Sequence, residues 1–184
     1  FHPIEENDRW WGAGFTEWRN VTRALPRFVG HQQPRLPRDL GFYDLRNPDT
    51  LRRQIELAKA ALISGFAFYF YWFNGKRLLD QPIEIFLEKT DLEFPFFLIW
   101  ANENWTRRWD GFDDDVLIQQ DYDEADDEAL VDEFCRHFSD PRYERIDGRP
   151  LLVIYRPGII ADCEKRIQAW RELFLSRHAE EPLI

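Results

Sequence analysis

The sequence predicts an α/β fold around a parallel β-sheet, and three observations carry this prediction. Short apolar runs alternate with amphipathic segments in the order strand, helix, strand, helix, strand, helix. The apolar runs lack polar alternation, which is typical of strands covered on both faces. The length of 184 residues is enough for one domain with a substantial core. We expect residues 1–184 to form a single domain.

Two architectures fit this alternation. One is a (β/α)₈ barrel of the TIM type, which needs about 250 residues, so the chain would supply only about its first half. The alternative is an open parallel α/β sheet. In both, consecutive strands should be parallel neighbours joined by right-handed crossovers, with helices packed outside.

The first regular element is predicted after a long loop. Residues 1–47 show no sustained helical or strand period, and a loop of this length is usually functional. Asn47 can cap a helix and Pro48 suits its first position. The helix should run for about 14 residues, with an apolar stripe of Leu51, Ile55, Ala58 and Leu62.

The remaining elements follow from short apolar runs and helical periods. The segment 123–138 carries acids in its first turn and basic groups at its end, which complements a helix dipole. Asp147-Gly148 indicates a turn. Strands are predicted at 66–73, 94–100 and 151–155, helices at 82–89, 123–138 and 163–174, an irregular segment at 101–115, and the start of another strand at 182–184.

Composition excludes several classes of protein. Hydrophobic residues make up 44% and charged residues 32% of the chain, which excludes a disordered protein. No stretch approaches the roughly 20 apolar residues of a spanning helix, so we expect no membrane insertion. The net charge of −10 argues against nucleic acid as a partner. Two cysteines, Cys135 and Cys163, are too few for a disulfide scaffold.

The absence of methionine in a chain that begins with Phe1 suggests a piece of a longer protein. A partial barrel would leave strand edges unpaired and apolar surface uncovered. We therefore expect this chain, taken alone, to self-associate and to show little turnover.

Candidate site residues follow from the rule that ligands bind at the carboxyl ends of parallel strands. Flat aromatic rings beside amides and carboxylates suit a sugar, since the rings cover C–H faces and the polar groups bind hydroxyls. The alternative is that the aromatic residues are simply core. The rule selects Tyr71, Trp72 and Asn74 after the first strand, Asn102, Glu103, Asn104 and Trp105 after the second, and Arg156 after the third.

Two carboxylates are candidate catalytic groups. Glu103 lies between two amides just past a buried strand and can act as acid, nucleophile or hydroxyl ligand. It can also simply tie down its own loop. Glu17 is the second candidate, because a glycosidase needs two carboxylates about 5–10 Å apart. From the long first loop, His2 and Trp18 are expected to join the substrate site.

Other motifs carry less weight. The triplet 113–115 matches the D-x-D pattern that holds a metal in many nucleotide-sugar transferases, but it is typical of a solvated loop. The histidines lack metal-ligand spacing, and Gly12-Ala13-Gly14 does not open a helix after a strand. We expect no metal and no cofactor.

A set of long motifs resembles one family. The sequence is similar to the WbsX-like, glycoside hydrolase family 99-like proteins of bacteria. The motifs are Phe1-His2-Pro3, Glu6-Asn7-Asp8, Trp10-Trp11-Gly12, Gly14-Phe15-Thr16-Glu17-Trp18, Gly30-His31-Gln32-Gln33-Pro34, Leu40-Gly41-Phe42-Tyr43-Asp44-Leu45-Arg46, Tyr71-Trp72-Phe73-Asn74-Gly75-Lys76, the run from Trp100 to Asp110, and Arg149-Pro150-Leu151.

The resemblance implies a (β/α)₈ barrel and chemistry on glycosidic bonds, by hydrolysis or by transfer. It also implies a role in surface polysaccharide and lipopolysaccharide O-antigen biosynthesis, an oligosaccharide or polysaccharide as partner, and a bacterial cytoplasmic location. The family has a later motif, N-x-W-N-E-W-x-E-G, beyond the point where this chain ends. On that pattern the main carboxylates lie past residue 184, and Glu17 and Glu103 line the sugar site. The competing hypothesis is a non-catalytic glycan-binding domain.

Overall fold

Residues 1–107 and 111–184 are described in the computed structural model, and their contacts divide the chain into two units. The first unit consists of residues 1–63 and 81–92. The second consists of residues 64–80 and 93–184 and contains the β-sheet. In residues 1–107 and 111–184, no helix has both the length and the apolar character needed to cross a membrane.

The first unit is helical, and its first two helices were not predicted. The stretch expected to be a loop contains α1 and α2, each of seven residues. Two turns are too short to display a hydrophobic period, so the sequence pattern does not reveal them. Acidic groups in the first turn of α1 stabilise the helix by interacting favourably with its dipole. The helices of this unit are α1 Glu5–Trp11, α2 Glu17–Arg23, α3 Pro48–Ala60 and α4 Gln81–Glu88.

Helix α3 begins as predicted and ends earlier than predicted. The Asn47 side chain accepts a hydrogen bond from the Asp49 N–H at 3.0 Å, which is the expected cap. Leu62 was expected in the apolar stripe, but it is 93% exposed. It adopts a left-handed conformation with φ of 60°, and the Ile63 N–H bonds the Ala58 carbonyl at 2.9 Å. This terminal turn stops the helix before Leu62 can join the buried face.

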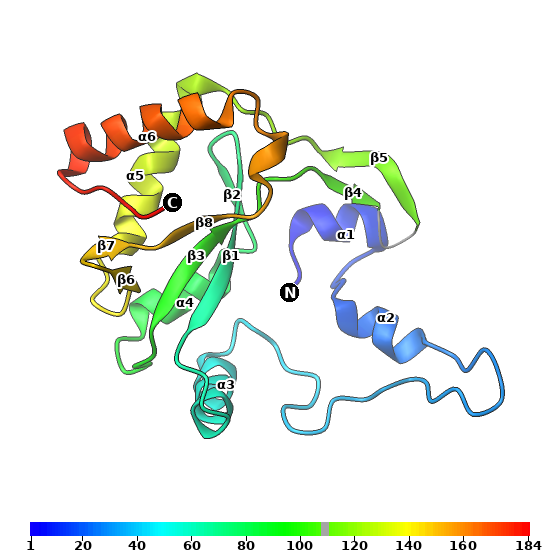
Figure 1. Cartoon of the computed structure of the whole chain (residues 1–184). Helices are drawn as coiled ribbons and strands as arrows, with labels where there is room; N and C mark the ends of the chain where they lie inside the picture. The colour runs from blue at the N-terminus through cyan, green and yellow to red at the C-terminus, as the bar shows by residue number, and fades with distance from the viewer. Residues whose placement is uncertain (108–110) are drawn as a thin grey trace. The chain divides into compact units, whose positions relative to one another are not determined.

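The second unit contains a four-stranded, mostly parallel sheet, as Figure 1 shows. Its strand order is β2-β1-β3-β8, and both pairs formed by β1, β3 and β8 are parallel. This confirms the α/β class and the predicted order of parallel neighbours. The edge strand β2 is antiparallel to β1 and was not predicted. The bounds are β1 Phe66–Phe73, β2 Lys76–Leu78, β3 Phe96–Trp100 and β8 Leu152–Ile154.

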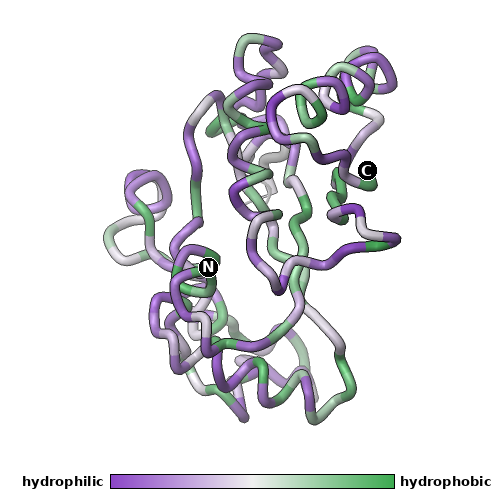
Figure 2. The backbone as a smooth tube through the Cα atoms, turned by 90° about the vertical axis from the view of Figure 1, so that its left-hand side faces the viewer, coloured by the Kyte–Doolittle hydropathy of each residue, from purple (hydrophilic) through white to green (hydrophobic). Residues whose placement is uncertain are grey.

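Two long helices cover one face of this sheet. The Trp100 ring of β3 lies 5.2 Å from the Trp170 ring of α6, and the Phe70 ring of β1 lies 5.0 Å from the Phe134 ring of α5. Figure 2 shows hydrophilic and hydrophobic residues alternating along the helices, as one-sided burial requires. The bounds are α5 Asp127–Phe138, preceded by the 3₁₀ turn η2 Glu124–Asp126, and α6 Cys163–His178.

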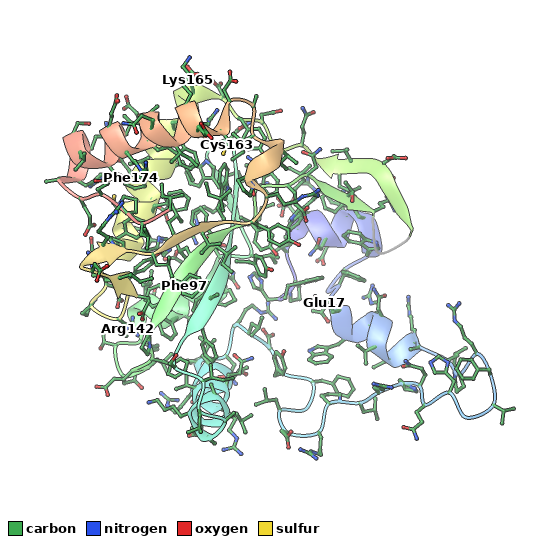
Figure 3. All side chains as sticks on the ribbon, viewed as in Figure 1. Glu17, Phe97, Arg142, Cys163, Lys165 and Phe174 are labelled. Carbon is green, nitrogen blue, oxygen red and sulfur yellow. The ribbon has the colours of Figure 1, made fainter. Side chains whose placement is uncertain are left out.

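The α5–α6 contact completes this core. Phe174 on α6, labelled in Figure 3, is fully buried and stacks on Phe138 of α5 with ring centroids 5.8 Å apart. Burial of each such side chain contributes roughly 1.5–3 kcal/mol. The core of this unit therefore lies between the sheet and the α5–α6 pair.

Two hairpins occupy the loops of the second unit. The segment 101–115, predicted to be irregular, contributes to an antiparallel pair, β4 with β5. Three consecutive acids in β5 conceal it, since acidic residues are rare in strands. The predicted Asp147-Gly148 turn is confirmed and joins β6 to β7, with both residues at positive φ. The bounds are β4 Trp105–Arg107, β5 Phe112–Ile118, β6 Arg145–Ile146 and β7 Arg149–Pro150, and the 3₁₀ turn after β8 is η3 Pro157–Ile159.

The predicted further strand is also visible. Leu183 forms a parallel bridge with Leu151, and its carbonyl accepts the Leu152 N–H at 2.9 Å. Residues near 183 therefore extend the parallel sheet beyond β8.

Candidate functional site

The carboxyl ends of β3 and β8 are joined by one buried amide. Asn102 lies two residues past the end of β3 and has no exposed surface. Its Oδ1 accepts the Arg156 N–H at 2.8 Å, and its Nδ2 donates to the Arg156 carbonyl at 2.9 Å. The Tyr122 hydroxyl donates to the Asn102 carbonyl at 2.5 Å and accepts from its Nδ2 at 3.2 Å. The two strand ends are thus fixed relative to each other.

A solvent-accessible ion pair lies beside this amide. The Arg156 Nη1 donates to the Glu103 Oε2 at 3.0 Å. The two side chains are 49% and 30% exposed, so both can also bind a ligand. Sequence analysis placed both residues at the strand ends, and the structure brings their charged groups together.

Aromatic rings from β1 and β4 lie at the same end of the sheet. The Trp105 ring meets the Tyr71 ring at 5.4 Å and the Phe73 ring at 5.8 Å, both edge to face. On the same strand face, the exposed Tyr69 and Tyr155 rings lie 5.9 Å apart. Such rings offer apolar surface of the kind that covers the C–H face of a sugar.

In the structure, the predicted residues Trp72, Asn74 and Asn104 all contact one segment of the chain. Each makes a hydrogen bond with the segment 120–126. The Trp72 indole N–H donates to the Asp126 carboxylate, and Trp72 itself is buried. The Asn74 Nδ2 donates to Asp121 at 3.0 Å, and the Asn104 Oδ1 accepts the Gln120 N–H at 2.7 Å. These side chains tie the segment across the strand ends.

Helix α6 holds the same segment from the other side. Arg166 donates to the Tyr122 carbonyl at 2.5 Å and to the Asp123 carbonyl at 3.0 Å, and pairs with Asp127. Burial raises the pKa of Tyr122, so its hydroxyl keeps its proton and can donate to Asn102. Burial also raises the pKa of Asp127 against the opposing effect of Arg166.

The remaining predicted site residues belong to the first unit. His2 is buried, and its Nδ1 donates to the Pro3 carbonyl at 2.9 Å. Glu17 begins α2, as Figure 3 shows. The half-buried Trp18 donates from its Nε1 to the Tyr43 carbonyl at 2.9 Å. Their part in a sugar site remains a prediction.

The acidic triplet is only partly described. Asp114 and Asp115 are exposed, and Asp115 pairs with Arg107 at 2.8 Å. The side chain of Asp113 and the motif residues 108–110 lie outside the described part of the chain.

Sequence reasoning missed the residues that arrange the site. Tyr122 and Arg166 lie 20 and 44 positions from the partners that they hold, Asn102 and Tyr122. One signal was present: Tyr122 is a lone aromatic residue among acids, where a solvated loop needs none. The exposed aromatic residues Tyr69, in β1, and Tyr155, directly after β8, were likewise not selected.

Fold and site together define an α/β protein with an aromatic and charged surface at the carboxyl ends of parallel strands. Residues 1–184 match the family described as "Glycosyltransferase WbsX" over their whole length. The chain belongs to this family, in agreement with the resemblance seen in the sequence.

Two curated relatives are similar to most of the chain. Both are named "Uncharacterized protein WxcX" and come from two strains of Xanthomonas campestris pv. campestris. Each is 54% identical over 171 residues, which is 93% of this chain and 25% of the relative. The chain therefore spans about a quarter of the length of these relatives. No solved structure matches.

Proposed function

We propose that this chain contributes the first part of the active site of an enzyme that acts on glycosidic bonds, by hydrolysis or transfer, in bacterial surface polysaccharide or lipopolysaccharide O-antigen biosynthesis. Membership in the WbsX glycosyltransferase family supports the reaction class. The observation that carries the site is the Glu103–Arg156 pair, 3.0 Å apart, at the end of the sheet where the Trp105 and Tyr71 rings also lie. The partner is an oligosaccharide or polysaccharide.

The chemistry of this pair fits a sugar. The Glu103 carboxylate accepts hydrogen bonds from hydroxyls, and the Arg156 guanidinium donates to hydroxyl or ring oxygens. A positioned carboxylate also stabilises the positive charge of an oxocarbenium-like transition state. In a retaining reaction, the attacking group at the glycosyl intermediate decides the outcome: water gives hydrolysis and a sugar hydroxyl gives transfer.

The larger architecture is part of the same proposal. The parallel order of β1, β3 and β8, with a further bridge at Leu183, supports a (β/α)₈ barrel completed by the longer protein. In that arrangement, further catalytic carboxylates come from later strands. Glu103 then binds or stabilises the sugar beside them.

Turnover by the full-length protein tests this proposal. The protein is incubated with fluorescently labelled oligosaccharides prepared from bacterial surface polysaccharides, and products are separated by mass. Shorter products indicate hydrolysis and longer products indicate transfer. Glu103→Gln should lower turnover at least about 100-fold, since it removes charge stabilisation. The control Glu172→Gln removes the same charge from an exposed position on α6 and should leave turnover unchanged.

A glycan-binding protein without catalysis is the second candidate. The observation that favours it is the neutralisation of the Glu103 carboxylate by Arg156. Under this alternative, the full-length protein binds labelled oligosaccharides and leaves them intact, and Glu103→Gln weakens binding. If the full-length protein neither binds nor turns over any surface polysaccharide, both candidates are overturned.

A further inference from the structure

Asn102 extends the β3–β8 pairing beyond the end of the strands. The last main-chain bond of the ladder runs from the Tyr155 N–H to the Trp100 carbonyl at 3.0 Å. One step further, the Asn102 side chain accepts the Arg156 N–H and donates to the Arg156 carbonyl. A side-chain amide carries the donor and acceptor of a peptide group, so it replaces the next main-chain partner.

Tyr122 completes the surroundings of this amide. Both polar atoms of the Asn102 side chain have partners inside the protein, and the side chain has no exposed surface. The main-chain carbonyl of Asn102 also has a partner, the Tyr122 hydroxyl. A bound sugar therefore cannot reach Asn102 without breaking these bonds.

Asn102, Glu103 and Arg156 are linked in a closed series of covalent and hydrogen bonds. Asn102 is the chain neighbour of Glu103, and it binds the main chain of Arg156. The Arg156 side chain returns to the Glu103 carboxylate at 3.0 Å. The positions of both charged groups thus depend on one buried amide.

We propose that Asn102 is a positioning residue: it fixes Glu103 and Arg156 at the strand ends for the glycan, instead of contacting the glycan itself. The inference rests on the proposed function of the Glu103–Arg156 pair. It also explains the residue type. Aspartate lacks the N–H groups that donate to Arg156 and Tyr122, and alanine leaves the Arg156 N–H and carbonyl without these partners.

Crystal structures of the full-length protein test the positioning without reference to activity. In Asn102→Ala, we expect the Arg156 Nη1 and Glu103 Oε2 atoms to separate beyond 3.5 Å, the limit of a hydrogen bond. The control is Asn20→Ala, which removes an amide from an exposed position on α2 and should keep the pair. A pair that remains intact in Asn102→Ala overturns the proposal.

A milder variant covers the case in which Asn102→Ala does not fold. Tyr122→Phe removes only the hydroxyl that bonds the Asn102 main chain and side chain. We expect this variant to fold and to show the Glu103–Arg156 pair in more than one arrangement. An unchanged, single arrangement overturns the proposal.

A double-mutant cycle separates positioning from general damage. We expect Asn102→Ala to lower kcat at least about 10-fold, because misplacement of reacting groups lowers rate steeply, and to change KM less than about 3-fold. In a Glu103→Gln background, Asn102→Ala should lower kcat by a smaller factor than in the wild type, because only Arg156 remains to be misplaced. Independent, multiplied losses overturn the proposal. If Glu103→Gln leaves turnover unchanged, the proposed function of Glu103 fails, while the crystal structures still decide the positioning.

Discussion

Two side chains join β3 to β8, one at each end of the pair, and they make the same kind of contact. At the amino end, the Tyr143 hydroxyl accepts the Leu98 N–H at 3.1 Å and donates to the Leu151 carbonyl at 2.8 Å. At the carboxyl end, the Asn102 amide accepts and donates to the main chain of Arg156. In both places, one buried polar group bridges the two strands.

The surroundings of the two bridges differ. Tyr143 is enclosed by the Phe96 and Phe138 rings at 5.2 and 4.8 Å. Asn102 lies next to the exposed pair of Glu103 and Arg156. The Tyr143 bridge, enclosed by apolar rings, contributes to stability alone. The Asn102 bridge is followed by charged side chains that can contact a ligand. This matches the general division of parallel α/β folds into a stabilising and a functional end.

The largest effect is expected from Tyr143→Phe at the amino end. Loss of the hydroxyl leaves the buried Leu98 N–H and Leu151 carbonyl without this partner, which costs about 2–4 kcal/mol of unfolding free energy. Urea unfolding of the full-length protein measures it. Glycan binding should not change, and the control Tyr69→Phe, at an exposed ring, should cost almost nothing. A loss of binding in Tyr143→Phe would contradict the division between the two ends.

A second effect comes from acid titration on the covered face of the sheet. Burial lowers the pKa of His137 on α5 to about 4, where its ring meets Phe70 edge-on. The unfolded chain binds this proton near pH 6.5, so the stability held by neutral His137 is complete above that pH and declines as pH falls towards 4. The loss is on the order of 3 kcal/mol.

Unfolding in urea at a series of pH values checks this prediction. His137→Gln should remove the decline between pH 6.5 and 4, whereas Glu103→Gln should keep it. A wild-type protein whose stability is flat across this window contradicts the assignment.

A smaller effect is expected from Trp72→Phe at the carboxyl end of β1. The variant keeps an aromatic ring and loses the indole N–H bond to Asp126, worth about 1–2 kcal/mol. Amide hydrogen exchange should accelerate in segment 120–126 and stay unchanged at the β6–β7 turn. Uniform acceleration in both places would mean that Trp72 stabilises the whole unit instead of holding this segment.

The smallest effect on stability is expected from Glu103→Gln. The ion pair with Arg156 is partly exposed, so its loss should change the free energy of unfolding by less than about 1 kcal/mol. Glycan binding or turnover should fall sharply in the same variant. The opposite result, a large loss of stability with function retained, would show that Glu103 only ties down its own loop.

Much of the sheet and little of the site arrangement could be predicted from the sequence. The strand at 66–73 and the helix start at Asn47-Pro48 carry local signals, an apolar run and a capping pair, and both are confirmed. Helix α1 and the β4–β5 hairpin were missed, because seven residues hide a period and acids obscure a strand.

The site arrangement, too, could be predicted only where it depends on local sequence. Chain position was sufficient to place Glu103 and Arg156 at neighbouring strand ends. It gave no sign that Asn102 turns inward, because that depends on the partner Tyr122, which lies 20 residues away. Hydrophobic periodicity indicates local secondary structure, and contacts between residues this far apart in the sequence produce no such period.

The bridge made by Asn102 also orders events during synthesis. Its partner Arg156 lies 54 positions later in the chain. At about 5–20 residues per second, the ribosome adds Arg156 roughly 3–11 s after Asn102. Until then the amide has no strand to join, and Glu103 has no counter-ion. The charged pair is therefore assembled only after the polypeptide from β3 to β8 has been made and has docked.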